Sequence, residues 1–380
     1  MATHTAQYRR PPESSSGVLA KVFALFLGLM VAVLGFAALM LWADARNARD
    51  DANAAAAQGE AGAAAHTQHN TALPLNSFAG QVPANAQALA EAHKATDATL
   101  PPIPAGHIAN VHMTLKDVTV EIAPGVRYHT WSFSGHGVPG PVVHVREGQT
   151  VRMTLTNGGS IPHSIDFHAA RIAPNVAFRD VDPGKSFTFS FKAGDPGVFM
   201  YHCGTKPVLA HIANGMYGAI VVEPKSALPK ADRQYVLVAS EFYMNGDGIQ
   251  EPASLDMAKA HSMEPDWTTF NGYANQYVTH PLTADPGQTV RFWVVAAGPT
   301  LDTNFHVVGT IFNRAWVNGD MSQPQHGVQT VGVPAGGGAV FDVKIDQPGL
   351  YPFVSHAFAH VDLGQVGLLK VGNPKTTMSH

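Results

Sequence analysis

Short strand-like segments in the first half of this chain return in its second half. Residues 147–157, EGQTVRMTLTN, are matched by residues 286–298, PGQTVRFWVVAAG. Residues 193–203, AGDPGVFMYHC, are matched in the same way by residues 346–356, DQPGLYPFVSH. Alternating apolar and polar residues, separated by turns rich in Gly, Pro, Asn and Asp, are typical of β-sandwiches. The repeat therefore predicts two similar sandwiches in tandem.

The length and composition of the chain agree with this expectation. With 380 residues, the chain is long enough for two ordinary domains and an additional tail. Its 36 Gly and 27 Pro residues indicate many turns, and extended helical patterns are missing from its body. The 24 basic and 28 acidic groups offer no basic surface for nucleic acid, so we expect no nucleic-acid partner.

An apolar segment near the N-terminus predicts a membrane anchor. Residues 22–42 contain no charged residue, and about 20 apolar residues suffice to cross a bilayer as a helix. Arg9, Arg10 and Lys21 precede the segment and keep residues 1–21 in the cytoplasm by the positive-inside rule. The bulk of the chain is then extracytoplasmic, either periplasmic or extracellular. The alternative is a signal peptide that is cleaved near the small residues of WADA.

The segment that follows the anchor is expected to be a linker. Residues 43–104 are Ala-rich and polar, and such a segment buries too little apolar surface to become ordered. A transient helix is expected near NAQALAEAHKA. We expect the histidines of this segment, His66, His69 and His93, to be solvated.

One short segment collects ligands for a soft metal ion. Residues 199–218, FMYHCGTKPVLAHIANGMYG, hold the only cysteine of the chain, Cys203, together with His211 and Met216. A thiolate, two imidazoles and a weak thioether are the ligands of a blue-copper electron-transfer site. We expect His163, on a strand far upstream, to supply the second imidazole. The alternatives are an inert buried thiol and a zinc site, but structural zinc sites use no thioether.

Strand geometry predicts a second group of histidines, because side chains alternate between the two faces of a strand. His202 and Cys203 are adjacent and must point apart. His163 and His168 are five residues apart and must do the same. A half-site made only of imidazoles is therefore expected where His168 and His202 share the face opposite Cys203. The alternative is that both are ordinary polar residues of an outward face.

A third histidine is needed, because two are too few to hold a catalytic metal tightly. The repeat places the end of GLYPFVSHAFAH where GVFMYHC ends in the first half, which nominates His356, with His360 as the rival. If His356 cannot reach the first domain of its own chain, it can reach that of a neighbouring subunit. Such contacts would close a ring of like subunits.

Four segments together resemble the copper-containing nitrite reductases: FSGHGVPGPVVHVREGQTV, PHSIDFH, YHCGTKPVLAHIANGMYG and NFHVVG. The resemblance spans roughly residues 105–373. It implies two cupredoxin-like Greek-key sandwich domains, residues 105–226 and 227–375, in a homotrimer. It also implies two coppers per subunit, one of type 1 inside the first domain and one of type 2 at each interface. The implied ligands are His163, Cys203, His211 and Met216 for type 1, and His168, His202 and His356 of the adjacent chain for type 2.

The resemblance also implies the reaction, the reduction of nitrite to nitric oxide. This reaction needs one electron and two protons, and one oxygen leaves as water. Asp166 matches the catalytic aspartate of the family and His306 its catalytic histidine, while Val308 falls where a bulkier aliphatic residue usually covers the substrate copper. The expected electron donor is a small cupredoxin or a c-type cytochrome. From the residues alone, His306 could instead be a core histidine and Asp166 a turn former.

Two other functions are compatible with the same fold. A two-domain multicopper oxidase would reduce oxygen at a trinuclear cluster, which draws on His-x-His pairs and a His-Cys-His triplet, and this sequence has neither. A non-enzymatic electron carrier would keep the blue-copper ligands but could dispense with Asp166, His168, His306 and His356. The presence of all four residues favours the reductase.

Overall fold

The computed structural model of the protein describes residues 82–319 and 321–374. The predicted anchor, residues 22–42, and most of the predicted linker lie outside these residues. Among the helices that are described, none has both the length and the apolar character needed to span a bilayer.

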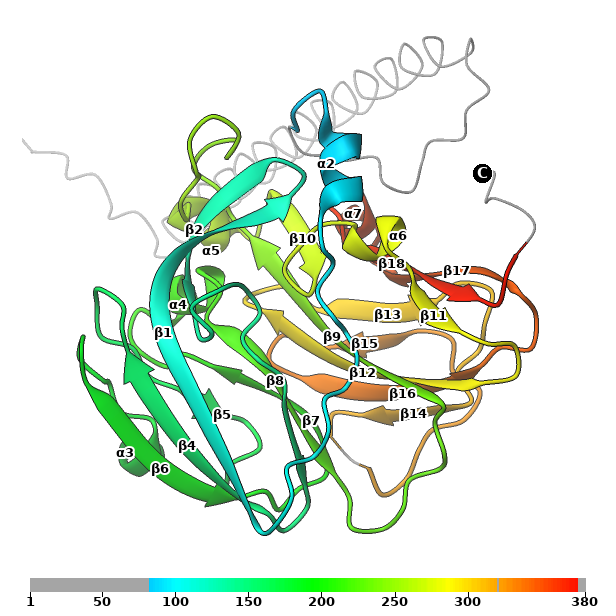
Figure 1. The fold of residues 1–380 in the computed structure, drawn as a ribbon, viewed down its shortest axis with the longest axis horizontal. Helices are drawn as coiled ribbons and strands as arrows, with labels where there is room; N and C mark the ends of the chain where they lie inside the picture. The colour runs from blue at the N-terminus through cyan, green and yellow to red at the C-terminus, as the bar shows by residue number, and fades with distance from the viewer. Residues whose placement is uncertain (1–81, 320, 375–380) are drawn as a thin grey trace, which may run out of the picture. The chain divides into compact units, whose positions relative to one another are not determined.

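The first sandwich consists of two four-stranded sheets, with strand orders β2-β1-β4-β6 and β3-β8-β7-β5 (Figure 1). Its strands are β1 (Ile108–Ala123), β2 (Val126–Ser132), β3 (Val143–Arg146), β4 (Thr150–Asn157), β5 (Asp166–Phe167), β6 (Ser186–Lys192), β7 (Gly197–His202) and β8 (Tyr217–Glu223). Two short helices, α3 (Pro174–Ala177) and α4 (Val208–Ala213), lie in the connections before β6 and β8.

The second sandwich consists of two five-stranded sheets, with strand orders β10-β9-β12-β16-β14 and β11-β18-β17-β13-β15. Its first strands are β9 (Arg233–Phe242), β10 (Trp267–Phe270), β11 (Leu282–Ala284), β12 (Thr289–Gly298) and β13 (Thr303–Val307). The others are β14 (Arg314–Val317), β15 (Val331–Val333), β16 (Gly338–Lys344), β17 (Gly349–Ser355) and β18 (Val366–Val371). The helices in its connections are α5 (Met257–Ser262), α6 (Gln276–Thr279) and α7 (Phe358–Asp362).

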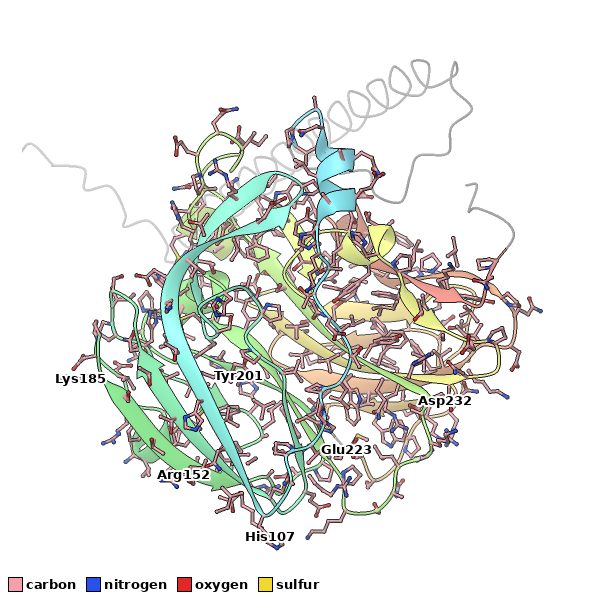
Figure 2. The ribbon with its side chains drawn as sticks, in the orientation of Figure 1. His107, Arg152, Lys185, Tyr201, Glu223 and Asp232 are labelled. Carbon is pink, nitrogen blue, oxygen red and sulfur yellow. The ribbon has the colours of Figure 1, made fainter. Side chains whose placement is uncertain are left out.

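Alternation in the sequence explains the core of the first sandwich. In β4, the side chains of Val151, Met153 and Leu155 are buried, whereas Arg152 between them is exposed. One face of the strand therefore packs on the core and the other meets solvent. Figure 2 shows the same division, with Arg152 on the outside of the sandwich and the fully buried Tyr201 in its interior.

The strand that matches β4 in the second half, β12, is buried on both faces. Every residue from Val290 to Gly298 is buried. Trp293 and Val295 belong to an apolar cluster that also contains Val198 and Tyr217 from β7 and β8 of the first sandwich. The two sandwiches thus share a third core between them. This shared core explains why the sequence of β12 is a continuous apolar run rather than an alternating one.

The all-β prediction is confirmed, and the sequence repeat corresponds to a repeated topology. β4 runs parallel to β1 and antiparallel to β6, just as β12 runs parallel to β9 and antiparallel to β16. β7 pairs antiparallel with β8, as β17 does with β18. The strands of the first sandwich fall within residues 108–223 and those of the second within residues 233–371.

The end of the predicted linker differs from the expectation, because residues 82–104 pack against the sandwiches. This segment begins with helix α2 (Ala86–Ala92) and continues along β9, where Val236 donates its N–H to the carbonyl of Ala98 at 2.7 Å. His93, which was expected to be solvated, stacks on Tyr273 with ring centroids 3.7 Å apart. Local composition misses this docking because the partner groups lie far away in the sequence.

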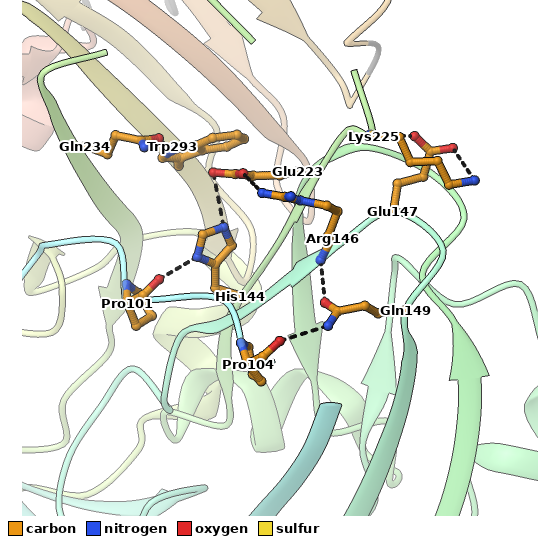
Figure 3. A network of polar contacts seen from close by, with 10 residues as sticks. All are labelled: Pro101, Pro104, His144, Arg146, Glu147, Gln149, Glu223, Lys225, Gln234 and Trp293. Carbon is orange, nitrogen blue, oxygen red and sulfur yellow. Dashed lines mark hydrogen bonds and ion pairs between the residues drawn. The ribbon is translucent and has the colours of Figure 1, made fainter. Parts of the chain in front are cut away.

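Polar contacts fasten the same segment to the first sandwich (Figure 3). The ring of the buried His144 bonds the carbonyl oxygen of Pro101 through Nδ1 at 2.5 Å, and Gln149 donates to the carbonyl of Pro104 at 2.9 Å. On its other side, His144 Nε2 lies 3.4 Å from Glu223 Oε1. Arg146 contacts the second oxygen of Glu223, also at 3.4 Å.

This network predicts a contribution to stability that depends on pH. The contact with His144, and then that with Arg146, hold the pKa of Glu223 below its ordinary value of 4.5, although burial opposes this effect. The unfolded chain therefore binds a proton at Glu223 more readily than the folded protein does. The stabilising contribution of Glu223 is complete above pH 4.5 and is lost as the pH falls through the lower pKa of the folded state.

Glu223→Gln is expected to reduce the loss of unfolding free energy that acidification causes below pH 4.5. Urea denaturation of wild type and variant at a series of pH values measures the effect. Glu147→Gln serves as the matched control, because this carboxylate belongs to the same network but pairs with Lys225 at the surface. Identical pH dependence of wild type and Glu223→Gln would contradict the prediction.

Candidate metal centres

The first candidate centre lies inside the first sandwich, at the end of β7. Cys203 directly follows β7, His211 lies on α4, and Met216 directly precedes β8. His163 comes from the connection between β4 and β5. The four side chains are buried, so the strand ends and the short helix bring them together in the apolar interior.

Three of these side chains have ligand atoms that converge. Cys203 Sγ lies 3.2 Å from His211 Nδ1 and 3.9 Å from His163 Nδ1, and the two Nδ1 atoms are 3.0 Å apart. Nitrogen and sulfur ligands about 2.0–2.3 Å from a shared ion lie roughly 3–4 Å from one another, which agrees with these distances. The thiol is free and fully buried.

Burial keeps the imidazoles of this centre neutral. It lowers the pKa of His163 to about 4, with a further contribution from the neighbouring His211. Burial also lowers the pKa of His211. Neutral imidazole is the form of histidine that binds a metal ion.

Backbone hydrogen bonds hold Met216 next to Cys203 and His211. Cys203 donates its N–H to the carbonyl of Met216 at 3.1 Å, and Met216 donates its own to the carbonyl of His211 at 3.2 Å. The thioether side chain is fully buried. These two hydrogen bonds connect Met216, the last residue of the loop, directly to Cys203 and His211.

Two residues beyond the predicted ligands, Ser164 and Trp131, contact the first centre. The backbone N–H of Ser164 points at Cys203 Sγ at 3.3 Å, a contact of the kind that stabilises a thiolate. The half-buried Trp131 packs against His211 and His163, with ring centroids 4.8 Å and 5.2 Å away. Ser164 could have been suspected from its position beside His163, but nothing local indicates Trp131.

The second candidate centre lies on the opposite face of β7. Asp166 on β5 is paired in register with His202 on β7, and His168 directly follows β5. The Nε2 atoms of His168 and His202 are 3.0 Å apart, and Asp166 Oδ2 lies 4.0 Å from His202 Nε2. The two clusters lie on the faces that strand alternation predicts, and the peptide bond between His202 and Cys203 joins them.

Hydrogen bonds orient both rings of the second centre. His168 Nδ1 lies 3.0 Å from the carbonyl oxygen of Gly336, and His202 Nδ1 lies 2.9 Å from that of Cys203. A carbonyl oxygen only accepts, so each Nδ1 carries the proton and each Nε2 presents a lone pair. Two lone pairs that meet at 3.0 Å repel each other unless a cation lies between them. The arrangement therefore fits a metal ion bound through both Nε2 atoms.

A proton on His202 is unfavourable as the cation between the two Nε2 atoms. Burial lowers the pKa of His202; the carbonyl of Cys203 partly offsets this effect, His168 adds to it, and Asp166 opposes it. The ring of His202 therefore stays neutral at neutral pH. Two imidazoles with the side chain of an aspartate beside them suit a divalent cation.

The other predicted residues lie on the second sandwich. His306 on β13 and His356, which directly follows β17, have ring centroids 5.5 Å apart. His306 Nδ1 lies 2.6 Å from the carbonyl oxygen of Gln329, and Val308 is 40% exposed. The rival ligand, His360, is half-buried, with its Nδ1 3.2 Å from Ser355 Oγ.

The structure does not bring these residues to the second cluster within one chain. Among the described residues, the ligand atoms that gather with His202 are those of Asp166 and His168. His356 is exposed and does not belong to this group. The second centre thus has two imidazoles and lacks a third from its own chain.

Comparison with known proteins gives consistent matches. Two family profiles, both described as multicopper oxidase, match residues 114–227 and 248–375. The copper-containing nitrite reductase of Neisseria gonorrhoeae is 42% identical over 267 residues, 69% of this chain and 68% of that protein. The structure of the copper nitrite reductase from Nitrosomonas europaea is 37% identical with a TM-score of 0.63, covering 70% of this chain and 95% of that one. That of the copper-containing nitrite reductase from Thermus scotoductus is 29% identical with a TM-score of 0.65, covering 70% and 62%.

These relatives confirm the resemblance drawn from the four sequence segments. The buried cysteine sulfur and two imidazoles are a donor set that suits copper. The sequence lacks the His-x-His pairs of a trinuclear oxidase cluster, so the oxidase alternative is not favoured. The chain therefore belongs to the family of copper-containing nitrite reductases.

Proposed function

We propose that this oxidoreductase performs the one-electron reduction of nitrite to nitric oxide, with a type 1 and a type 2 copper in each subunit. One observation carries the proposal: two clusters of metal ligands lie on opposite faces of β7 and are joined by the peptide bond between His202 and Cys203. The overall reaction combines nitrite, one electron and two protons to give nitric oxide and water.

The first cluster would hold the type 1 copper through His163, Cys203, His211 and Met216. The second would hold the type 2 copper through His168, His202 and a third imidazole. When bound, copper supplies one-electron redox chemistry at the first cluster and a Lewis acid with an open position at the second. Since Cys203 and His202 are neighbours in the chain, one peptide unit connects a ligand of each cluster.

Asp166 and His306 would supply the protons that the reaction consumes. The half-buried Asp166 has its Oδ2 atom 4.0 Å from His202 Nε2, where it can hydrogen-bond an anion held beside the imidazoles and donate a proton to it. His306 donates from Nδ1 to the carbonyl of Gln329, which leaves Nε2 as the atom that takes up and releases a proton. The exposed Val308 lies two residues after His306 and would line the substrate pocket.

A homotrimer would complete the second centre. His356 is exposed and lies beside His306, so one surface of the second sandwich could offer both side chains to a neighbouring subunit. A large apolar side chain lies on this surface, since Phe358, whose ring lies 4.7 Å from that of His356, is 55% exposed. Exposed apolar groups next to unused ligands are typical of a subunit interface.

The cellular placement follows from the N-terminal sequence. Residues 22–42 would anchor the enzyme in a membrane, with the two sandwiches on the periplasmic or extracellular side. Removal of the segment as a signal peptide would place the same sandwiches on the same side. The electron donor would be a small cupredoxin or a c-type cytochrome.

Two measurements test this function. Purified protein given a reductant and nitrite without oxygen is expected to release nitric oxide, and no release would refute the assigned reaction. Copper analysis separates the alternatives, because an electron carrier would hold one copper per subunit, the reductase two, and a trinuclear oxidase four.

Met216→Leu tests the axial ligand of the first cluster. The variant is expected to raise the reduction potential and change the visible absorption spectrum, because the weak axial ligand tunes both. Redox titration and absorption spectroscopy measure the two effects. Met200→Leu is the matched control. Met200, on β7, is buried like Met216, but it belongs to the core shared by the two sandwiches. An unchanged spectrum of Met216→Leu would remove Met216 from the ligand set.

A further inference from the structure

A glycine-rich turn of the second sandwich reaches the second metal centre of its own chain. The turn comprises residues 334–338, PAGGG, which connect β15 to β16 and include Gly338, the first residue of β16. The carbonyl oxygen of Gly336 lies 3.0 Å from His168 Nδ1, although 168 residues separate the two in the chain. This contact fixes the tautomer of His168, because the N–H at Nδ1 leaves the lone pair on Nε2.

Glycine is required in this turn at two positions. Gly336 has a φ angle of +80°, a conformation that is strained for residues with a side chain. A Cβ atom on Gly338 would lie 2.1 Å from the carbonyl oxygen of Val198 in β7, far inside contact distance. The turn therefore lies directly against the strand that ends in His202 and beside the ring of His168.

Three contacts hold the turn in place. Gly336 donates its N–H to the carbonyl of Ala296 in β12 at 2.7 Å, and Ala296 donates its own N–H to the carbonyl of Gly337 at 3.1 Å. The third contact comes from a side chain, since Ala335 donates its N–H to Asp302 Oδ1 at 2.9 Å. Asp302 precedes β13 and is exposed, so its position indicates no role in the core.

We propose that Asp302 is a positioning residue: its carboxylate pins the turn of residues 334–338, whose Gly336 carbonyl orients His168 for metal binding. The proposal rests on the proposed type 2 copper and extends it to a residue that contacts neither substrate nor metal. Asp302 acts through two hydrogen bonds in series, from Ala335 to its carboxylate and from His168 to Gly336. Loss of the first bond loosens the acceptor of the second.

The test measures binding of Cu²⁺ to the second centre in protein whose type 1 copper is retained. Asp302→Ala is expected to lower this affinity roughly tenfold, the lower end of the range for loss of a partner of a metal ligand. The electron paramagnetic resonance signal of the second copper should broaden, while the visible absorption of the type 1 copper stays unchanged. Asp302→Asn should restore affinity and signal, because the amide oxygen can still accept the N–H of Ala335.

Asp232→Ala is the matched control. Asp232 also accepts a backbone N–H at 2.9 Å, from Thr289, but at the opposite end of β12 from Ala296 (Asp232 is labelled in Figure 2). Ala296 lies seven positions after Thr289 in β12, which is roughly 23 Å along the strand. This variant should bind Cu²⁺ like wild type, so a loss in Asp302→Ala alone is specific to the turn.

A second readout needs no metal. In metal-free protein labelled with ¹⁵N-histidine, the resonances of His168 should report an Nδ1–H tautomer in wild type and in Asp302→Asn, and a mixture of tautomers in Asp302→Ala. Wild-type affinity and tautomer in Asp302→Ala would overturn the proposal. Equal losses of Cu²⁺ affinity in Asp302→Ala and Asp302→Asn would also overturn it, because the effect would then come from the negative charge of Asp302 and not from its hydrogen bond to Ala335. Wild type without a second copper would refute the proposed function instead.

Discussion

His356→Ala is expected to lose the type 2 copper and nitrite reduction while it keeps the blue type 1 copper. The second cluster has two imidazoles of its own chain, and the exposed His356 lies outside that cluster. Two neutral nitrogens hold a divalent ion far less tightly than three. The ligands of the first cluster are buried elsewhere, so its spectrum should be unaffected. Copper analysis, absorption spectroscopy and nitric oxide release measure the three effects.

Co-expression of two inactive variants tests whether His356 acts between subunits. His168→Ala removes the ligand of the first sandwich and His356→Ala that of the second. With equal expression and random assembly, about a quarter of all sites would combine an intact first sandwich with an intact second one from the neighbour, so activity should return. His360→Ala is the matched control and should keep its copper. No recovery in mixtures, or loss of copper in His360→Ala, would contradict the assignment.

Asp166→Asn is expected to bind both coppers and to reduce nitrite about 10²–10⁴-fold more slowly, the usual contribution of a general acid. The amide keeps the shape of the side chain but has no acidic proton that it can transfer to the substrate. Asp166 lies in register with His202, so the substitution changes the site at the place where the substrate anion would bind. Stopped reactions that follow nitric oxide release, together with copper analysis, measure the effect.

The control for this experiment is Asp182→Asn, which changes an exposed carboxylate of the first sandwich. It should keep the wild-type rate. The dependence of the rate on pH adds a second criterion, because removal of a proton donor should remove one ionisation from the profile. Wild-type turnover in Asp166→Asn would exclude its role as a proton donor.

Much of the fold could be predicted, because the alternation of apolar and polar residues is a local property. The pattern of β4 predicted one buried and one exposed face, and the structure confirms it. The same reasoning could not predict that β12 is buried on both faces, since its outer face is covered by β7 and β8 of the other sandwich. The docking of residues 82–104 was missed for the same reason.

The sequence by itself determined which candidate metal-binding side chains are present and that they form two groups on opposite sides of the chain at the end of β7. His202, the last residue of β7, and Cys203 directly after it must face two ways, because side chains alternate along extended backbone. Only the tertiary structure decided which atoms meet. The register of β5 against β7 placed Asp166 opposite His202, and a turn 168 residues away set the tautomer of His168. Such contacts depend on how distant strands and loops pack, and the local sequence does not specify that packing.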